Sequence, residues 1–156
     1  MVNLPQIILA SGSPRRSEIM ESVGWKFIKD VPDIDETELP GELPDVYVQR
    51  LARTKAESGQ IVLGADTTVV INDQIIGKPV DVTDAKRMLT MLSGNWHEVL
   101  TGVAVVRNGN SRAGLQRTRV KFAEMSETEI DFLAERGDPL DKAGAYAVQA
   151  QAALFI

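Results

Sequence analysis

A short apolar run that stops abruptly constrains the fold of this sequence more than any other feature. Residues 6–10 are mostly apolar and lead at once into Ser-Gly-Ser-Pro, after which residues 15–23 carry apolar side chains at helical spacing. A run of this length bounded by Gly and Pro favours a strand, and the longer period that follows favours a helix. The sequence therefore predicts a strand that enters a helix through a tight loop.

The rest of the chain keeps alternating between strand and helix patterns. Strands are expected at 25–29, 61–64, 68–71, 74–76, 99–107 and 117–122, and helices at 45–58, 84–92 and 126–136, whereas 112–116 has no clear pattern. Asn72-Asp73 reads as a hairpin turn, Asp81 or Thr83 as a helix cap, and Ser126 with Glu129 as a capping box. Helices interleaved with hairpins predict an α/β fold whose mixed sheet is flanked by helices. The 156 residues, 44% of them hydrophobic, suit a single domain spanning 1–156.

Composition excludes several classes of function. A net charge of -5 argues against binding of duplex nucleic acid, so an anionic ligand would need locally placed cations. The sequence has no apolar run near the ~20 residues that a membrane-spanning helix needs, and its first residues lack the order of a secretory signal. We therefore expect a cytoplasmic protein without a membrane partner. With no cysteine, the chain cannot use thiolates for metal binding or nucleophilic attack.

The loop between the first strand and helix is a candidate phosphate site. Free backbone N–H groups and the helix dipole favour an anion at a helix N-terminus. Arg15 and Arg16 could bind phosphate oxygens bidentately, and Ser11 and Ser13 offer hydroxyl donors. A capped helix with two solvated arginines is an equally good interpretation of this segment alone.

Asp66 is the second candidate, because it follows the apolar run 61–63, where an ionised carboxylate is costly without a cation or strong donors. It could hold Mg²⁺ or orient an attacking water, with Glu36 of the acidic segment as a second oxygen ligand. Three further acids compete with Glu36 for that role: Asp33, Asp35 and Glu38. The structural alternative for Asp66 is an acid that closes a turn at the end of a strand. The structural alternative for Glu36 is a solvated acidic loop.

Lys55 and Lys78 could neutralise a triphosphate and stabilise the leaving pyrophosphate, although a single lysine is more often a solvated surface residue. His97 is the only histidine, and a structural hydrogen bond is the favoured interpretation of it. Walker, Rossmann, HExxH and EF-hand patterns do not occur in the sequence.

Seven ordered motifs together resemble the Maf family. They are LASGSPRR at 9–16, DET at 35–37, LARTKA at 51–56, GADT at 64–67, GKPVD at 77–81, LSGNWHEVLTGVAV at 92–105 and PLDKAGAYAVQ at 139–149. The resemblance covers essentially the whole chain. It implies a fold like that of inosine-triphosphate pyrophosphatases, with an elongated mixed sheet, a cleft between two lobes, and commonly a homodimer.

The resemblance also implies an activity: hydrolysis of a nucleoside triphosphate between its α and β phosphates with a divalent cation, Mg²⁺ or Mn²⁺. Carried over by motif, Asp66 corresponds to the group that activates water, close to the metal, and Glu36 assists metal or water. Lys55 and Lys78 correspond to phosphate-side partners. Ser11, Arg15 and Arg16 correspond to the substrate-binding entrance loop.

Three positions bear on the substrate within that resemblance. Arg15, Thr67 and Gln149 look like the dTTP/UTP branch of the family, and Gln149 could donate to and accept from a pyrimidine edge. The late motif has Ala147, Ala150 and Ala152 where the family is usually glycine-rich, which restricts conformations with φ > 0 there. Family members usually continue through a further strand and helix, so we expect a domain shortened at its C-terminus.

Two other functions remain open at this point. One is the same reaction on 7-methyl-GTP or another modified nucleotide. The other is a nucleotide-binding regulator of septum formation that does not hydrolyse its ligand. Direct binding of DNA is disfavoured by the net charge.

Overall fold

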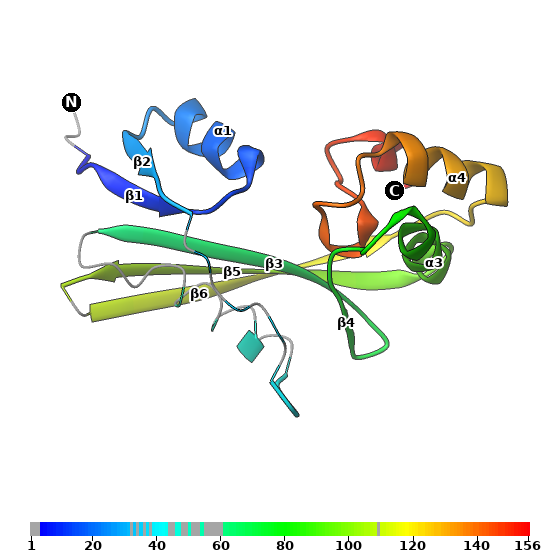
Figure 1. The fold of residues 1–156 in the computed structure, drawn as a ribbon, viewed down its shortest axis with the longest axis horizontal. Helices are drawn as coiled ribbons and strands as arrows, with labels where there is room; N and C mark the ends of the chain where they lie inside the picture. Colours follow the sequence, from blue (N-terminus) through cyan, green and yellow to red (C-terminus); the bar gives the residue numbers. More distant parts are fainter. Residues whose placement is uncertain are drawn as a thin grey trace. The chain divides into compact units, whose positions relative to one another are not determined.

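The structure is a computed structural model of the 156-residue chain, and it describes residues 4–31, 33, 35, 37, 39–43, 46–47, 50, 54, 61–108 and 110–156. Its strands are β1 (Ile7–Ala10), β2 (Phe27–Lys29), β3 (Val62–Ile71), β4 (Gln74–Ile76), β5 (Trp96–Arg107) and β6 (Asn110–Lys121). Its helices are α1 (Pro14–Ser22), α3 (Val82–Leu92) and α4 (Glu127–Arg136), with the 3₁₀ turns η1 (Ala143–Ala145) and η2 (Gln151–Leu154) (Figure 1). Along the described stretches, every helix is too short or too polar to cross a bilayer.

The strands form one mixed sheet in the order β2-β1-β3-β5-β6, and β4 pairs with the end of β3. β1 runs parallel to both of its neighbours, with Ile8 opposite Ile28 of β2 and Val62 of β3. β3 and β4 are antiparallel, with Val70 opposite Ile75. The predicted α/β fold with a mixed sheet flanked by helices is therefore confirmed.

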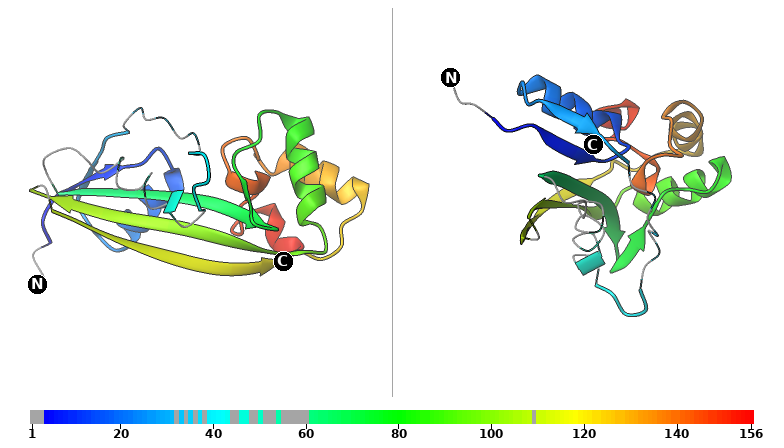
Figure 2. Two further views of the ribbon diagram at one scale, coloured as in Figure 1. Left: turned by 90° about the horizontal axis from the view of Figure 1, so that it is seen from below. Right: turned by 60° about the vertical axis from the view of Figure 1, so that its left-hand side comes forward.

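The chain groups into two compact units. The first contains Met1–Asp66 and Thr101–Gln116, and the second contains Thr67–Leu100 and Arg117–Ile156. Each of the long strands β3, β5 and β6 contributes residues to both units (Figure 2). That residues 1–156 act as one domain stays a prediction.

In the first unit, α1 lies over β1 and β2 and buries Met20 against them (Figure 1). Ile7 and Leu9 project from the same face of β1 into this cluster, and Trp25 closes it, with its Nε1 donating to the Pro5 carbonyl at 2.9 Å. Ala10 and Val62 belong to a second cluster, since alternate residues of a strand face opposite sides of the sheet. Both faces of β1 are therefore packed.

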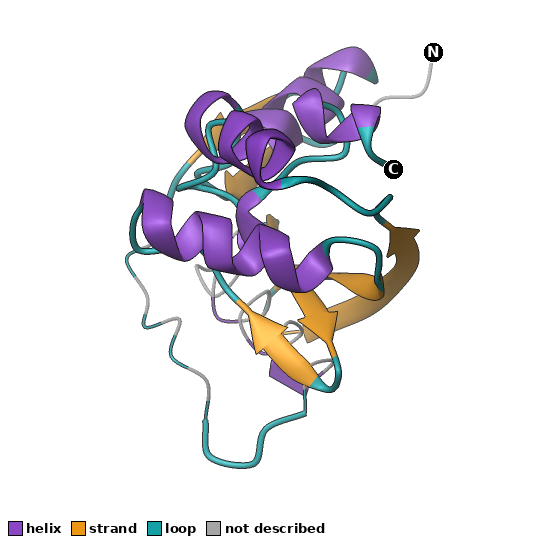
Figure 3. Cartoon of the chain, turned by 90° about the vertical axis from the view of Figure 1, so that its right-hand side faces the viewer, coloured by secondary structure: helices purple, strands orange, loops and turns teal. Residues whose placement is uncertain are grey.

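The second unit holds the larger core, in which α3 and α4 pack together over the β3–β4 hairpin (Figure 3). Asn72 and Asp73 have φ of 51° and 60°, as the tight hairpin turn requires. The α3 cap is Asp81, whose side chain accepts from the Asp84 amide, and the capping box at Ser126 is formed as predicted. These caps satisfy backbone donors that a helix start otherwise leaves exposed.

Some boundaries differ from the sequence-based expectation. β3 is one continuous strand through Ala65, Asp66 and Thr67, where two shorter runs were expected, and β6 includes 112–116. Each strand lies beside the twelve-residue β5, and pairing with a long neighbour overrides the weak local preference for a strand at these positions. The helix expected at 45–58 lies largely outside the described residues.

Candidate active site

The loop that enters α1 is organised by the hydroxyl of Ser11. Ser11 is 3% exposed, and its Oγ accepts from the Ser13 amide at 3.3 Å and from Nη1 of Arg16 at 2.8 Å. Ser13 is the N-cap residue of α1, but its side chain makes no capping hydrogen bond. Pro14 occupies the first helical position, where its missing N–H costs nothing. The first turn of α1 thus has the arrangement of a helix N-terminus that can receive an anion.

Arg16 also joins this loop to β3. The same Nη1 donates to the carbonyl oxygen of Ala65 at 2.9 Å. The β1–β3 ladder pairs the Ile8 amide with the Ile61 carbonyl, and continuing it two residues at a time would place the Gly12 amide at the Ala65 carbonyl. β1 ends at Ala10, so the guanidinium supplies the donor that the strand no longer provides. Arg16 is half-buried, and the alternative of a solvated arginine does not hold for it.

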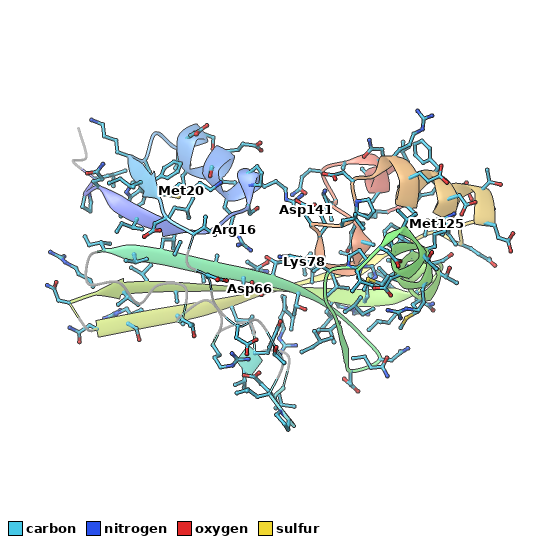
Figure 4. All side chains as sticks on the ribbon, viewed as in Figure 1. Arg16, Met20, Asp66, Lys78, Met125 and Asp141 are labelled. Atoms are coloured by element: carbon cyan, nitrogen blue, oxygen red, sulfur yellow. The ribbon has the colours of Figure 1, made fainter. Side chains whose placement is uncertain are left out.

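Asp66 follows Ala65 directly on β3 and is half-buried (Figure 4). Strand alternation places it on the same face of β3 as Val62 and Thr68. The loop contact of Arg16 therefore fixes the backbone one residue before the predicted catalytic carboxylate. The second predicted metal ligand, Glu36, lies outside the described residues, as does Lys55.

Two of the acids that compete with Glu36, Asp33 and Asp35, are described, and Glu38 is not. Hydrogen bonds from Thr37 hold the pKa of Asp35 below its usual value, and the Thr37 amide reaches its Oδ1 at 2.9 Å. Arg50 donates to the Thr37 carbonyl at 3.0 Å and forms a two-pronged ion pair with Glu42 at 2.7 and 2.8 Å. Among the described residues, no group of three or more acidic or histidine side chains is arranged to hold a metal ion.

The remaining described candidates belong to the second unit. Lys78 is exposed in the loop between β4 and α3, and Thr67 is half-buried on β3. Gln149 is exposed in a turn closed by a hydrogen bond from the Ala150 amide to the Ala147 carbonyl at 3.0 Å.

The alanines of the late motif do not occupy strained positions. Ala147, Ala150 and Ala152 all lie outside the left-handed region of backbone conformation. The non-glycine residue of this motif that does adopt it is Ala145, with φ of 65°. Replacing the family's usual glycines by these three alanines therefore imposes no backbone strain, because none of the three positions has φ > 0.

His97 makes the structural hydrogen bond that the sequence suggested. It is 3% exposed, its Nε2 lies 2.6 Å from the hydroxyl of Tyr146, and its ring stacks on Phe122. Burial lowers the pKa of His97 against a smaller opposing effect of the Asn95 backbone, and burial raises the pKa of Tyr146 far above its usual range. Both rings are therefore neutral near pH 7.

Sequence reasoning missed Lys142. Its side chain is 7% exposed, and its ammonium group donates to the carboxylates of Asp138 at 2.9 Å and Asp141 at 2.6 Å and to the Asp138 carbonyl. Lysine is rarely buried unless it is paired. The available signal was the pair of acids one and four residues before it, the second spacing being that of an ion pair across a helical turn.

Comparison with known proteins gives matches along nearly the whole chain. The family model described as "Maf-like protein" matches residues 6–156. The dTTP/UTP pyrophosphatase of Symbiobacterium thermophilum is 45% identical, over 98% of this chain and 82% of that protein. The proteins of the same name from Anaeromyxobacter dehalogenans and Vibrio cholerae are 47% and 41% identical, over 97% and 99% of this chain and 81% and 87% of theirs.

Among solved structures, a protein of Vibrio cholerae aligns over 86% of this chain and 72% of its own, with 11% identity and a TM-score of 0.41. That similarity is too weak to bear on the fold.

Proposed function

Because this chain belongs to the Maf family, we propose that it hydrolyses nucleoside triphosphates, dTTP and UTP foremost, to the monophosphate and pyrophosphate. The structural observation that carries the proposal is the contact from Arg16 to Ala65, which holds the anion-binding start of α1 against the strand that presents Asp66. The names of the relatives support the reaction and its pyrimidine substrates.

The chemistry assigned to each residue follows from its charge and from the family motif in which it stands. Water attacks the α-phosphorus, its proton passes to the carboxylate of Asp66, and the bond from the α-phosphorus to the α,β-bridging oxygen breaks, which releases pyrophosphate. Ser11 in the loop before α1 and Arg15 in the first turn of α1 are assigned to binding phosphate oxygens. Arg16 adds positive charge there and fixes the loop through its hydrogen bonds to Ser11 and Ala65. Lys78 and Lys55 are assigned to the charge that develops on the leaving pyrophosphate.

A divalent cation, Mg²⁺ or Mn²⁺, belongs to the same proposal. Mg²⁺ in phosphate-processing sites is usually held by one or two carboxylates together with substrate phosphates rather than by a full protein cage. The single half-buried carboxylate of Asp66 fits that mode of binding, and Glu36 is the proposed second ligand. When bound, the cation would neutralise the triphosphate and polarise its phosphorus.

Substrate choice is assigned to Arg15, Thr67 and Gln149, of which Gln149 is exposed and has an amide able to pair with a pyrimidine edge. A homodimer in the cytoplasm is the assembly and location we infer from the family. A nucleoside triphosphate is the partner, with neither nucleic acid nor membrane involved.

The test is release of pyrophosphate from dTTP, UTP, CTP, GTP and 7-methyl-GTP with Mg²⁺ or Mn²⁺, comparing the wild type with Asp66→Asn. We expect turnover of dTTP and UTP that EDTA abolishes and that Asp66→Asn reduces at least ~100-fold while nucleotide binding persists. Preference for 7-methyl-GTP would move the chain to another branch. A folded wild type that binds nucleotide without turnover would favour a regulator and overturn the proposal.

A further inference from the structure

The loop that carries Lys78 is attached to the late motif by one backbone hydrogen bond. The Gly144 amide donates to the Gly77 carbonyl at 2.9 Å, immediately before Lys78. On the other side of Lys78, Pro79 is buried, and a proline restricts the residue before it to extended conformations. The exposed lysine thus stands between two fixed neighbours.

Gly144 occupies a place that no other residue can take without displacement. Its φ is 70°, in the left-handed region, and a Cβ built on it would lie 2.9 Å from Cγ2 and 3.2 Å from Cβ of Val69. Val69 is 2% exposed on β3, three residues beyond Asp66. The absence of a side chain therefore lets the Gly144 backbone approach β3 and the Gly77 carbonyl together.

The turn that presents Gly144 is held on both sides. Before it, the buried Lys142 is clamped by Asp138 and Asp141, and its amide donates to the Pro139 carbonyl at 3.1 Å. After it, Tyr146 is fixed by its hydrogen bond to His97. Figure 4 shows Asp141 and Lys78 in the same part of this unit. Two successive left-handed residues, 144 and 145, persist where surrounding contacts impose them.

We propose that Gly144 is a positioning residue for Lys78: its close packing on Val69 delivers the amide that fixes the Gly77 carbonyl and so aims the lysine at the substrate phosphates. The inference rests on the proposed function. Misplacing a charged group that acts on the transition state by about 1 Å costs roughly 100-fold in rate, so the role is measurable in kcat.

The matched pair of variants is Gly144→Ala and Gly94→Ala. Gly94 lies in the same unit with φ of 71°, yet a Cβ there would meet nothing nearer than 3.8 Å. Both alanines meet the same backbone penalty, and only Gly144→Ala collides with Val69. We expect Gly144→Ala to lower kcat for dTTP about 10- to 100-fold with KM nearly unchanged, and Gly94→Ala to keep the kcat of the wild type.

Two further backgrounds separate positioning from general damage. In the Lys78→Ala background, adding Gly144→Ala should lower kcat no further, because both changes remove the same contribution, that of a correctly placed Lys78 side chain. In Val69→Ala, the nearest collision is relieved, so Val69→Ala/Gly144→Ala should recover most of the kcat of Val69→Ala. This pair also carries the comparison if Gly144→Ala alone does not fold.

The outcomes distinguish this inference from the function on which it rests. If the folded wild type releases no pyrophosphate from any nucleotide, the proposed function fails and the inference fails with it. If the wild type turns over and Gly144→Ala matches Gly94→Ala in kcat, or still lowers kcat in the Lys78→Ala background, the positioning role alone is overturned.

Discussion

Arg16 donates to the carbonyl oxygen of Ala65, 49 residues further along the chain, at 2.9 Å. This contact takes the place of a ladder hydrogen bond beyond the end of β1 and, through Nη1, also reaches the buried hydroxyl of Ser11. Through these two hydrogen bonds Arg16 links the loop before α1 to β3, in addition to supplying positive charge. Its neighbour Arg15 has no such bond to β3 among the hydrogen bonds of the described residues.

Arg16→Lys should therefore damage the enzyme although it conserves the charge. Both bonds come from Nη1, and a lysine side chain ends one bond nearer the backbone than that nitrogen, so its ammonium does not reach both acceptors, which are largely buried. Loss of these hydrogen bonds should lower the free energy of unfolding by about 1–3 kcal/mol, together with a drop in kcat. Urea denaturation and steady-state kinetics with dTTP measure the two effects.

Arg15→Lys is the control for that prediction. It retains the charge at the start of α1 and breaks no contact to Ala65, so the free energy of unfolding should stay near that of the wild type, with the main effect on KM. An equal loss of stability in Arg15→Lys and Arg16→Lys would contradict the structural role of Arg16. Arg16→Lys in a Ser11→Ala background should cost less than in the wild type, because the two residues share one hydrogen bond.

The buried His97 makes stability depend on pH just below neutrality. The pKa of His97 in the folded chain lies below the ordinary 6.5. As the pH falls from about 6.5, His97 therefore becomes protonated in the unfolded chain while it stays neutral in the folded chain. The free energy of unfolding should accordingly fall with decreasing pH in this window and level off at higher pH. Urea midpoints between pH 5 and 8 would measure the effect.

His97→Gln should flatten that dependence, because His97 is the only histidine of the chain and an amide can still bond Tyr146. Glu42, Asp84 and Glu129 have lowered pKa values, so their contribution to the free energy of unfolding is lost only below about pH 4.5. These carboxylates therefore do not affect the slope between pH 5 and 6.5. A variant that keeps the full slope between pH 5 and 6.5 would show that another group causes it.

Local features of the sequence were sufficient for most of the architecture. The Ser-Gly-Ser-Pro break, the Asn72-Asp73 turn and the capping box at Ser126 each act through their own backbone neighbours, and all three appear as expected. The continuity of β3 through Asp66 was not predictable, because it depends on pairing with a strand distant in the sequence.

In the candidate site, too, local features could be predicted from the sequence and long-range contacts could not. The motifs identify which residues to examine, but the use of Arg16 depends on where β1 stops relative to β3. The fit of Gly144 against Val69 likewise arises from packing between segments far apart in the chain. Such contacts leave no periodic signal in a single sequence.

Ser126→Ala tests a purely local contribution. The Ser126 hydroxyl caps α4, and the Glu129 side chain returns to the Ser126 amide at 2.8 Å. Removing the hydroxyl should lower the free energy of unfolding by about 1 kcal/mol without changing kcat or KM. A change in KM larger than in the wild-type repeats would show that α4 influences the site.

Gln149→Ala tests the proposed base contact. Gln149 is exposed in the turn closed by Ala150 and Ala147, so truncating it should leave the thermal midpoint almost unchanged. If its amide pairs with the pyrimidine edge, kcat/KM for dTTP and UTP should fall roughly 10- to 100-fold, the effect of about 1.4–2.8 kcal/mol. CTP, whose base presents a different pattern of donors and acceptors, should be affected less. Gln151→Ala, an exposed glutamine two residues further on, is the matched control and should keep the preference of the wild type. An equal loss for every nucleotide would place Gln149 in phosphate or sugar binding, and no loss would remove it from the substrate site.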